Sequence, residues 1–169
     1  MPAIAKSNGD MTTVDGNKLF PVLNMLNAKY FILPLQGGKT VPLQNPYAYG
    51  NAWFVDKVDY VDNANEEIDR VGKLDLRHEA VADKKFQEQM GQSKTQDQTS
   101  VVKITSYQPN QLEYQVSSGK GGIIVFSEIY YPGWTATVDG QPTDIGRVNY
   151  ILRAINVKPG HHKIVLKFF

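Results

Sequence analysis

The sequence predicts a mainly β protein, in which residues 99–169 form an antiparallel β-sandwich and residues 1–98 form a smaller, mixed α+β part. Three observations predict this arrangement. Six apolar-rich segments follow one another at short, even spacing after residue 100, turns rich in glycine and proline separate them, and several alternate apolar with polar side chains. Evenly spaced short strands with turn signals between them are typical of sandwiches. The apolar share of 41% is enough to form a buried core.

The first 98 residues predict helices and strands in mixture. Pro21, followed by apolar side chains at helical spacing, predicts a short helix that ends near residue 27, and the apolar run at 30–33 predicts a strand. Proline, glycine and asparagine crowd the next segment, which predicts a long loop at 36–51 before a second strand at 52–58.

The rest of this part predicts a helix, a strand and a linker. We expect a helix at 63–72 with Ile68 and Val71 facing inward, then a strand at 76–82 and one or two exposed helical turns at 84–90. Residues 88–100 are polar and nearly free of apolar side chains, so they predict a linker or long loop at the end of the first part.

The second half predicts six strands, at residues 101–107, 111–117, 122–130, 134–139, 150–157 and 162–169. Turn signals separate them, among them an Asp-Gly pair at 139–140 that is typical of a tight hairpin. Alternation places Leu112, Tyr114 and Val116 on one face of their strand. Residues 123–126 are apolar on both faces, so their strand is expected to be central.

Composition excludes several classes of function. The 18 basic and 17 acidic side chains nearly cancel, so no global field favours nucleic acid as a partner. The absence of cysteine excludes a disulfide framework, a thiolate nucleophile and cysteine zinc sites. No stretch approaches the roughly 20 apolar residues that span a bilayer.

No catalytic or metal-binding constellation is visible in the sequence. It lacks the Gly-x-Ser-x-Gly turn of a serine hydrolase, and its neighbouring histidines, His161 and His162, point to opposite faces of a strand and cannot easily share a metal. Three aspartates at 56, 59 and 62 do not complete a calcium loop. We therefore expect no catalytic residue, no metal and no cofactor in this region.

Aromatic and arginine side chains of the second half are the candidate ligand-binding residues: Tyr130, Tyr131, Trp134, Arg147, Tyr150 and Arg153. Flat aromatic faces bind sugar rings, and the planar guanidinium suits phosphate or carboxylate. A structural explanation competes with this one. The aromatics can pack a strand-to-strand corner, and Glu128 can pair with Arg147 or Arg153 across a sheet, if residues 130–134 lie beside 147–153.

Short motifs, taken in order, resemble the C-terminal soluble region of bacterial YfhO-type membrane proteins. Four of them lie in the second half: Tyr130-Tyr-Pro-Gly-Trp134, Val138-Asp-Gly140, Asn149-Tyr-Ile-Leu-Arg-Ala154 and Pro159-Gly-His-His-Lys-Ile164. Upstream, residues 23–32 and 50–55 are similar to segments that precede this region in the same family. The resemblance therefore extends over nearly the whole chain.

The resemblance implies a role in a larger protein. The family consists of polytopic membrane proteins that resemble GT-C-type glycosyltransferases using lipid-linked sugars, and it is implicated in glycosylating cell-envelope polymers. Their catalytic acids are expected near the first membrane helices, which this sequence does not contain. The chain is then expected to be a non-catalytic extracytoplasmic accessory domain, periplasmic or at the cell surface and tethered to the membrane. Its expected partners are the parent's own transmembrane region and a glycan or lipid-linked sugar.

One alternative from a different class remains. The chain can also be an independent β-sandwich module for carbohydrate binding or protein adhesion. The two interpretations differ in whether membrane spans are encoded on either side of this region in the reading frame.

Overall fold

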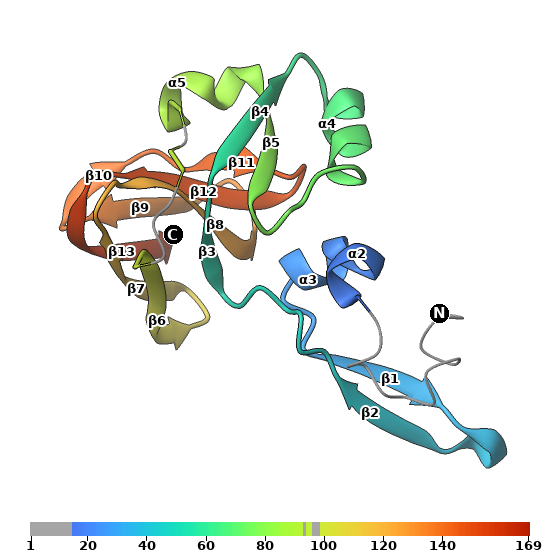
Figure 1. The fold of residues 1–169 in the computed structure, drawn as a ribbon. Helices are drawn as coiled ribbons and strands as arrows, with labels where there is room; N and C mark the ends of the chain where they lie inside the picture. The colour runs from blue at the N-terminus through green and yellow to red at the C-terminus, as the bar shows by residue number, and fades with distance from the viewer. Residues whose placement is uncertain (1–14, 93, 96–98) are drawn as a thin grey trace. The chain divides into compact units, whose positions relative to one another are not determined.

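A computed structural model describes residues 15–92, 94–95 and 99–169 (Figure 1). Strands hold 49% of the residues and helices 17%, which confirms the mainly β fold class. Contacts along the chain divide it into two units, residues 1–50 and 51–169, and each is described here by itself. The domain boundary expected at residue 98 stays a prediction.

The described part of the first unit consists of two short helices and a hairpin. The helices are α2 (Gly16–Leu19) and α3 (Pro21–Met25), and the hairpin pairs β1 (Tyr30–Pro34) with β2 (Thr40–Gln44) through a 3₁₀ turn at Gln36–Gly38. Phe31 is buried, and the apolar side chains around it are Phe20, Leu23, Leu33, Leu43 and Tyr47. The helix and first strand were predicted. The prediction of a long loop at 36–51 is wrong, because the segment contains β2. This strand forms despite Pro42, since an edge strand tolerates proline.

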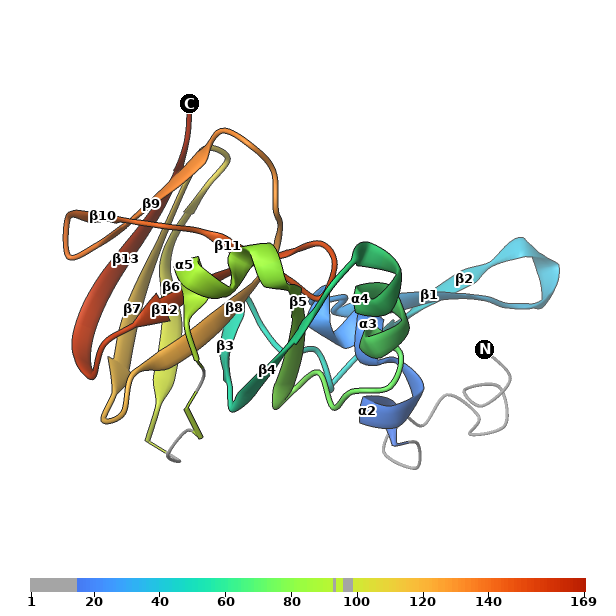
Figure 2. The same ribbon diagram turned by 90° about the horizontal axis from the view of Figure 1, so that it is seen from above.

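Two antiparallel sheets dominate the second unit (Figure 2). The five-stranded sheet runs in the order β10 (Gln141–Thr143), β9 (Trp134–Val138), β13 (Gly160–Phe168), β7 (Gln111–Ser118), β6 (Val101–Gln108). The four-stranded sheet runs β11 (Gly146–Val148), β12 (Leu152–Val157), β8 (Gly122–Ile129), β3 (Ala52–Val55). A shared core fills the space between them, with side chains such as Tyr114, Phe126, Ile155 and Leu166 from both sheets. The six predicted strands are all present.

The structure adds two short strands, β10 and β11, and shortens the one expected at 150–157. That strand starts at Leu152 because Asn149 and Tyr150 adopt left-handed backbone angles, φ 51° and 72°, and form a turn. The expected Asp-Gly hairpin turn lies between β9 and β10, where Asp139 and Gly140 both have positive φ. The segment 123–126 is fully buried in β8, between β12 and β3, as expected for a central strand.

A strand–helix–strand element follows β3. It contains β4 (Lys57–Val61), α4 (Ala64–Val71) and β5 (Glu79–Asp83), and its two strands pair in parallel. The strand expected at 52–58 is therefore two strands in different sheets. Asn63 caps α4 by accepting from the Asn65 and Glu66 backbone nitrogens. The inward position expected for Ile68 is wrong, since it is 50% exposed, whereas Glu67 and Val71 are buried.

Residues 57–90 cover the face of the four-stranded sheet that points away from the core between the sheets. A 3₁₀ turn (Lys84–Phe86) and α5 (Gln87–Met90) complete this cover. Phe86 and Met90 are buried, so the prediction that these helical turns are exposed is wrong at these two positions. The Trp53 indole donates to the Leu76 carbonyl, and the Asn156 amide donates to the Met90 carbonyl. Part of the expected linker at 88–100 lies outside the described residues.

Candidate functional site

A pocket of about 380 Å³ lies where the turn between β8 and β9 meets the segment after β10 and the start of β12. It collects four of the six predicted ligand-binding residues, Tyr130, Tyr131, Trp134 and Arg153. Its other lining residues were not predicted, and all of them belong to the same turn or to the segment 135–145: Pro132, Gly133, Thr135, Ala136, Pro142, Thr143, Asp144 and Ile145.

Backbone hydrogen bonds shape the turn that carries the aromatics. The Tyr130 nitrogen donates to the Ile151 carbonyl at 2.7 Å. Gly133 has φ 100°, an angle that other residues rarely adopt, and its carbonyl accepts from the Phe169 nitrogen. The Phe168 ring then lies 5.6 Å from the Trp134 ring, centre to centre. The turn therefore packs a corner, as the structural explanation expected, and still leaves Tyr131 63% exposed at the pocket.

Arg153 occupies a position that would otherwise belong to the core between the sheets. Its side chain lies on the same side of β12 as Ile155 and is 3% exposed, with the guanidinium carbon 3.9 Å from the centre of the Trp134 ring. The Nε atom donates to the Ile129 carbonyl at 2.9 Å, whereas the buried Nη1 atom has no hydrogen-bond partner among the described residues. Burial lowers the pKa of Arg153, and the charge of Glu128 partly offsets this.

A family model described as "Bacterial membrane protein YfhO" matches residues 71–169, which is more than half of the chain and includes every residue that lines the pocket. The chain belongs to the YfhO family. No curated protein and no solved structure matches it significantly. Across the described residues, no helix of this YfhO chain is both long and apolar enough to cross a membrane.

The other two predicted site residues of the YfhO chain lie outside the pocket lining. Arg147 contacts the Glu67 carboxylate through its Nη2 atom at 2.6 Å, and the Tyr150 nitrogen donates to the other oxygen of this carboxylate at 2.8 Å. The Arg147 guanidinium also lies 5.7 Å from the Phe86 ring centre and 5.4 Å from that of Tyr150. A ligand-binding role for Arg147 and Tyr150 stays a prediction.

Glu67 is fully buried, and sequence reasoning missed it. Burial raises its pKa, although the Tyr150 nitrogen and the Arg147 charge act in the opposite direction. The expected pairing of Glu128 with Arg147 is wrong, and among the described residues Glu128 forms no ion pair with Arg153 either. One signal could have identified Glu67: it precedes the inward-facing Val71 by four residues and so shares its helix face.

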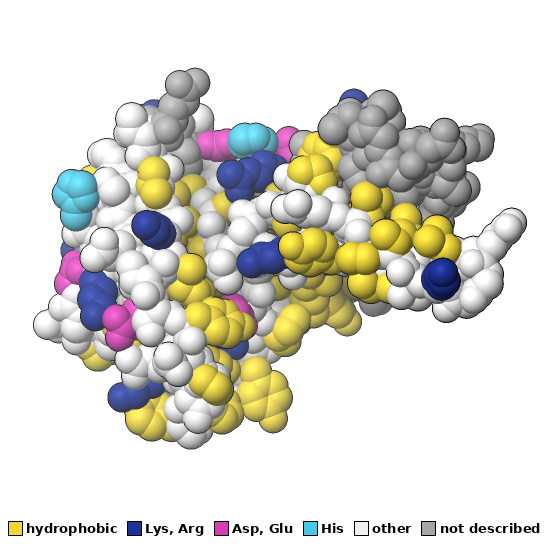
Figure 3. Space-filling model, turned by 90° about the horizontal axis from the view of Figure 1, so that it is seen from below, with side chains coloured by type: hydrophobic (Ala, Val, Ile, Leu, Met, Phe, Trp, Pro, Cys, Tyr) yellow, Lys and Arg dark blue, Asp and Glu magenta, His cyan; other side chains and the backbone are white. Residues whose placement is uncertain are grey.

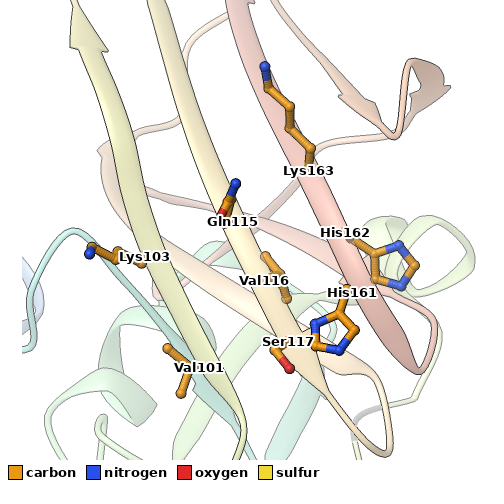
Figure 4. Close-up of a pocket in the computed structure, with 8 residues that line it drawn as sticks. All are labelled: Val101, Lys103, Gln115, Val116, Ser117, His161, His162 and Lys163. Atoms are coloured by element: carbon orange, nitrogen blue, oxygen red, sulfur yellow. The ribbon is translucent and has the colours of Figure 1, made fainter.

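A second hollow, of about 420 Å³, lies over strands β6, β7 and β13 (Figure 4). Its polar side chains come from neighbouring strands and do not converge on one point, and Lys163 is engaged with Glu113 at 2.9 Å. The His162 ring contacts Asp139 through Nδ1 and the Lys158 carbonyl through Nε2. In the part of the chain that the structure describes, no three His, Asp or Glu side chains come close enough to hold a metal.

The aromatic pocket is thus the arrangement with the clearest binding chemistry. It combines the exposed Tyr131 ring with a buried cation, Arg153, whose Nη1 atom has no hydrogen-bond partner among the described residues. Its lining contains one carboxylate, Asp144, whereas glycoside hydrolysis ordinarily uses a pair. These groups can bind a sugar ring and an anionic substituent, and they do not form an acid–base pair.

Proposed function

We propose that this region is a non-catalytic, extracytoplasmic accessory domain of a polytopic YfhO protein that resembles lipid-linked-sugar glycosyltransferases. Its aromatic pocket holds a glycan or the sugar of a lipid-linked donor. Membership of a membrane protein family supports a membrane-embedded parent protein. The resemblance of the sequence motifs supports the glycosyltransferase-like role. The observation that carries the binding proposal is the combination of Tyr131, Trp134 and Arg153 in one pocket.

The roles of the three side chains follow from their positions. Tyr131 offers an exposed ring at the rim, on which the apolar face of a pyranose can stack. Trp134 lies deeper and holds the Arg153 guanidinium against its own face, so the cation is positioned before a ligand arrives. Arg153 lines the pocket, and its positive charge attracts a sugar phosphate or uronic acid there. The proposed ligand is therefore a sugar that carries negative charge.

A glycan array that includes acidic and phosphorylated sugars tests this proposal with the purified chain. Tyr131→Ala is expected to weaken binding about three- to tenfold, which is the usual range for one aromatic contact. Tyr30→Ala is the matched control, because Tyr30 is 60% exposed and lies outside the pocket. Binding that survives Tyr131→Ala and Arg153→Gln unchanged, in variants with native circular dichroism, contradicts the pocket assignment.

The accessory role is tested in the full-length parent. We expect Arg153→Gln to lower its glycosyl transfer while the purified domain shows no transfer or hydrolysis of nucleotide sugars, polyprenyl sugars or aryl glycosides. Turnover by the purified domain that Glu128→Gln abolishes would refute the non-catalytic assignment. A cysteine introduced at exposed Ile68 of the parent should react with a membrane-impermeant maleimide in intact cells, and protection of this cysteine until lysis contradicts the extracytoplasmic location.

A further inference from the structure

The β1–β2 hairpin has one face that no described residue of its own unit covers. Register places Tyr30, Ile32 and Pro34 on this face, opposite Gln44, Pro42 and Thr40 of the partner strand. All six side chains are exposed, with Ile32 at 64% and Tyr30 at 60%. None of them is charged. We call these six residues the open face of the hairpin.

The opposite face accounts for the small core of this unit. Phe31 points to that side and is buried against the Phe20 ring and neighbouring apolar side chains. The open face is therefore not the missing half of that core. A two-stranded ribbon is marginally stable in water unless it packs on something, and contiguous exposed apolar patches mark interaction or membrane sites. Figure 3 shows hydrophobic side chains gathered over this hairpin.

The charge pattern around the hairpin identifies the kind of partner. Residues 19–50 contain two lysines, Lys29 and Lys39, and no acidic residue. Lys29 directly precedes β1 and Lys39 directly precedes β2, so the two cations lie at opposite ends of the ribbon. Lysines that flank an apolar surface reach towards lipid headgroups, and tyrosine favours the boundary between headgroups and acyl chains. The pattern is complementary to an anionic bilayer surface.

A second copy of the chain fits the hairpin less well. Pro34 in β1 and Pro42 in β2 each remove a backbone donor from their strand. Prolines in exposed strands oppose the addition of further strands, so docking by strand pairing is disfavoured. The hairpin therefore presents the apolar side chains of its open face to a partner, and not its strand edges.

We propose that the open face of the β1–β2 hairpin lies on the surface of an anionic lipid bilayer, with Tyr30, Ile32 and Pro42 in the boundary region and Lys29 and Lys39 against the headgroups. This inference goes beyond the glycan-binding proposal and does not depend on it. It gives the YfhO domain a second point of contact with the membrane, besides its connection to the rest of the parent.

Fluorescent labelling of the full chain tests the contact directly. The sequence has no cysteine, so Ile32→Cys carries a single environment-sensitive nitrobenzoxadiazole label without background. Ile68→Cys is the matched control, an exposed isoleucine in the other unit. Vesicles of phosphatidylcholine with phosphatidylglycerol are expected to shift the emission of the Ile32 label to the blue and to leave the Ile68 label unchanged.

Vesicle co-sedimentation measures the contributions of the apolar and charged groups. Replacing both Tyr30 and Ile32 with serine should weaken partitioning about tenfold or more, because both side chains lose most of their apolar surface. Each of Lys29→Gln and Lys39→Gln should cost about fivefold, and Lys73→Gln, an exposed lysine of the other unit, should cost nothing. Tyr131→Ala should also leave vesicle binding unchanged, which separates this test from the glycan test.

Four outcomes would overturn the proposal. In the labelling experiment they are an Ile32 label that responds to no vesicle, and Ile32 and Ile68 labels that respond equally. In co-sedimentation it is binding to purely zwitterionic vesicles that equals binding to anionic ones. In sedimentation equilibrium it is a dimer that forms without lipid and that the serine double variant abolishes. The last result would assign the open face to a second copy of the chain.

Discussion

Replacing Arg147 with methionine leaves Glu67 buried without its cation. Methionine keeps much of the apolar stem of arginine but lacks the guanidinium that lies over the Phe86 and Tyr150 rings, so the loss is chiefly electrostatic. The wild-type carboxylate is held by the Arg147 Nη2 atom at 2.6 Å and the Tyr150 nitrogen at 2.8 Å, and it has no exposed surface. In the variant the Tyr150 nitrogen is the one remaining hydrogen-bond donor to this carboxylate among the described residues.

Protonation limits how much this change can cost. Removing one partner of a buried ion pair typically costs about 3–5 kcal/mol. Glu67 can avoid most of that penalty by taking up a proton, at about 1.4 kcal/mol for each pH unit above the ordinary pKa of 4.5. The loss is therefore expected to be about 3 kcal/mol at pH 7 and under about 1 kcal/mol at pH 5. When the folded-state pKa of Glu67 lies above its unfolded value, the free energy of unfolding falls as the pH rises. This agrees with a larger loss at pH 7 than at pH 5.

Urea unfolding followed by tryptophan fluorescence at the two pH values measures this difference. Both tryptophans, Trp53 and Trp134, lie in residues 51–169, so the signal reports on the unit that contains the ion pair. Arg70→Met is the control, because Arg70 makes an exposed ion pair with Asp59. It should cost less than about 1 kcal/mol.

The double variant Glu67→Gln with Arg147→Met provides the decisive comparison. Without any buried charge it should recover most of the stability that the single Arg147→Met variant loses at pH 7. A single-variant loss that is the same at pH 5 and pH 7, or a double variant no more stable than the single one, would refute the account of this ion pair.

Three further changes test other parts of the second unit. Both ring nitrogens of His162 face acceptors, and the hydrogen bond to Asp139 raises the pKa of His162. Thermal unfolding should therefore show stabilisation below pH 6.5 that is lost as the pH rises through the folded-state pKa. His162→Gln should remove this pH dependence. Gly133→Ala should destabilise by about 1–3 kcal/mol in urea, because its φ is 100° and the new methyl would lie 2.9 Å from a phenylalanine ring of β13; an unchanged midpoint contradicts this. The Val81 nitrogen donates a hydrogen bond to the Asn149 Oδ1 atom at 3.0 Å, so Asn149→Ala should cost about 1–3 kcal/mol and speed hydrogen exchange at the Val81 amide. Slow exchange at Val81 in the variant would show that the contact is dispensable.

Local patterns were sufficient for most strands of the sandwich. Leu112, Tyr114 and Val116 alternate with polar neighbours, and the structure buries all three, because period-two alternation reports directly on the face of a strand. Short segments carry no such pattern: β11 has three residues, and Pro42 and the preceding glycines disguise β2. The break between β3 and β4 escaped prediction because residues 52–58 are apolar enough to suggest one strand.

The candidate site was predicted in composition more than in geometry. Tyr130, Tyr131 and Trp134 are neighbours in sequence, so their proximity follows from one turn. If residues 130–134 lie beside 147–153, Arg153 is expected near these aromatics. Tyr130 does lie beside this segment, since its nitrogen donates to the Ile151 carbonyl, but Trp134 begins β9, which pairs with β13 in the opposite sheet. The arginine reaches Trp134 across the sandwich. Long-range partners such as Glu67 and Arg147, 80 residues apart, leave no local signal that specifies the pairing.

The position of β13 has a consequence for how the sandwich assembles. It comes last in sequence among the described strands, yet it is the middle strand of its sheet, between β9 and β7. Before residues 160–168 leave the ribosome, the hairpins β6–β7 and β9–β10 have no common strand to join them. Because non-local pairing is slow and unpaired strand edges aggregate, the nascent chain depends on these hairpins staying separate until their shared neighbour arrives.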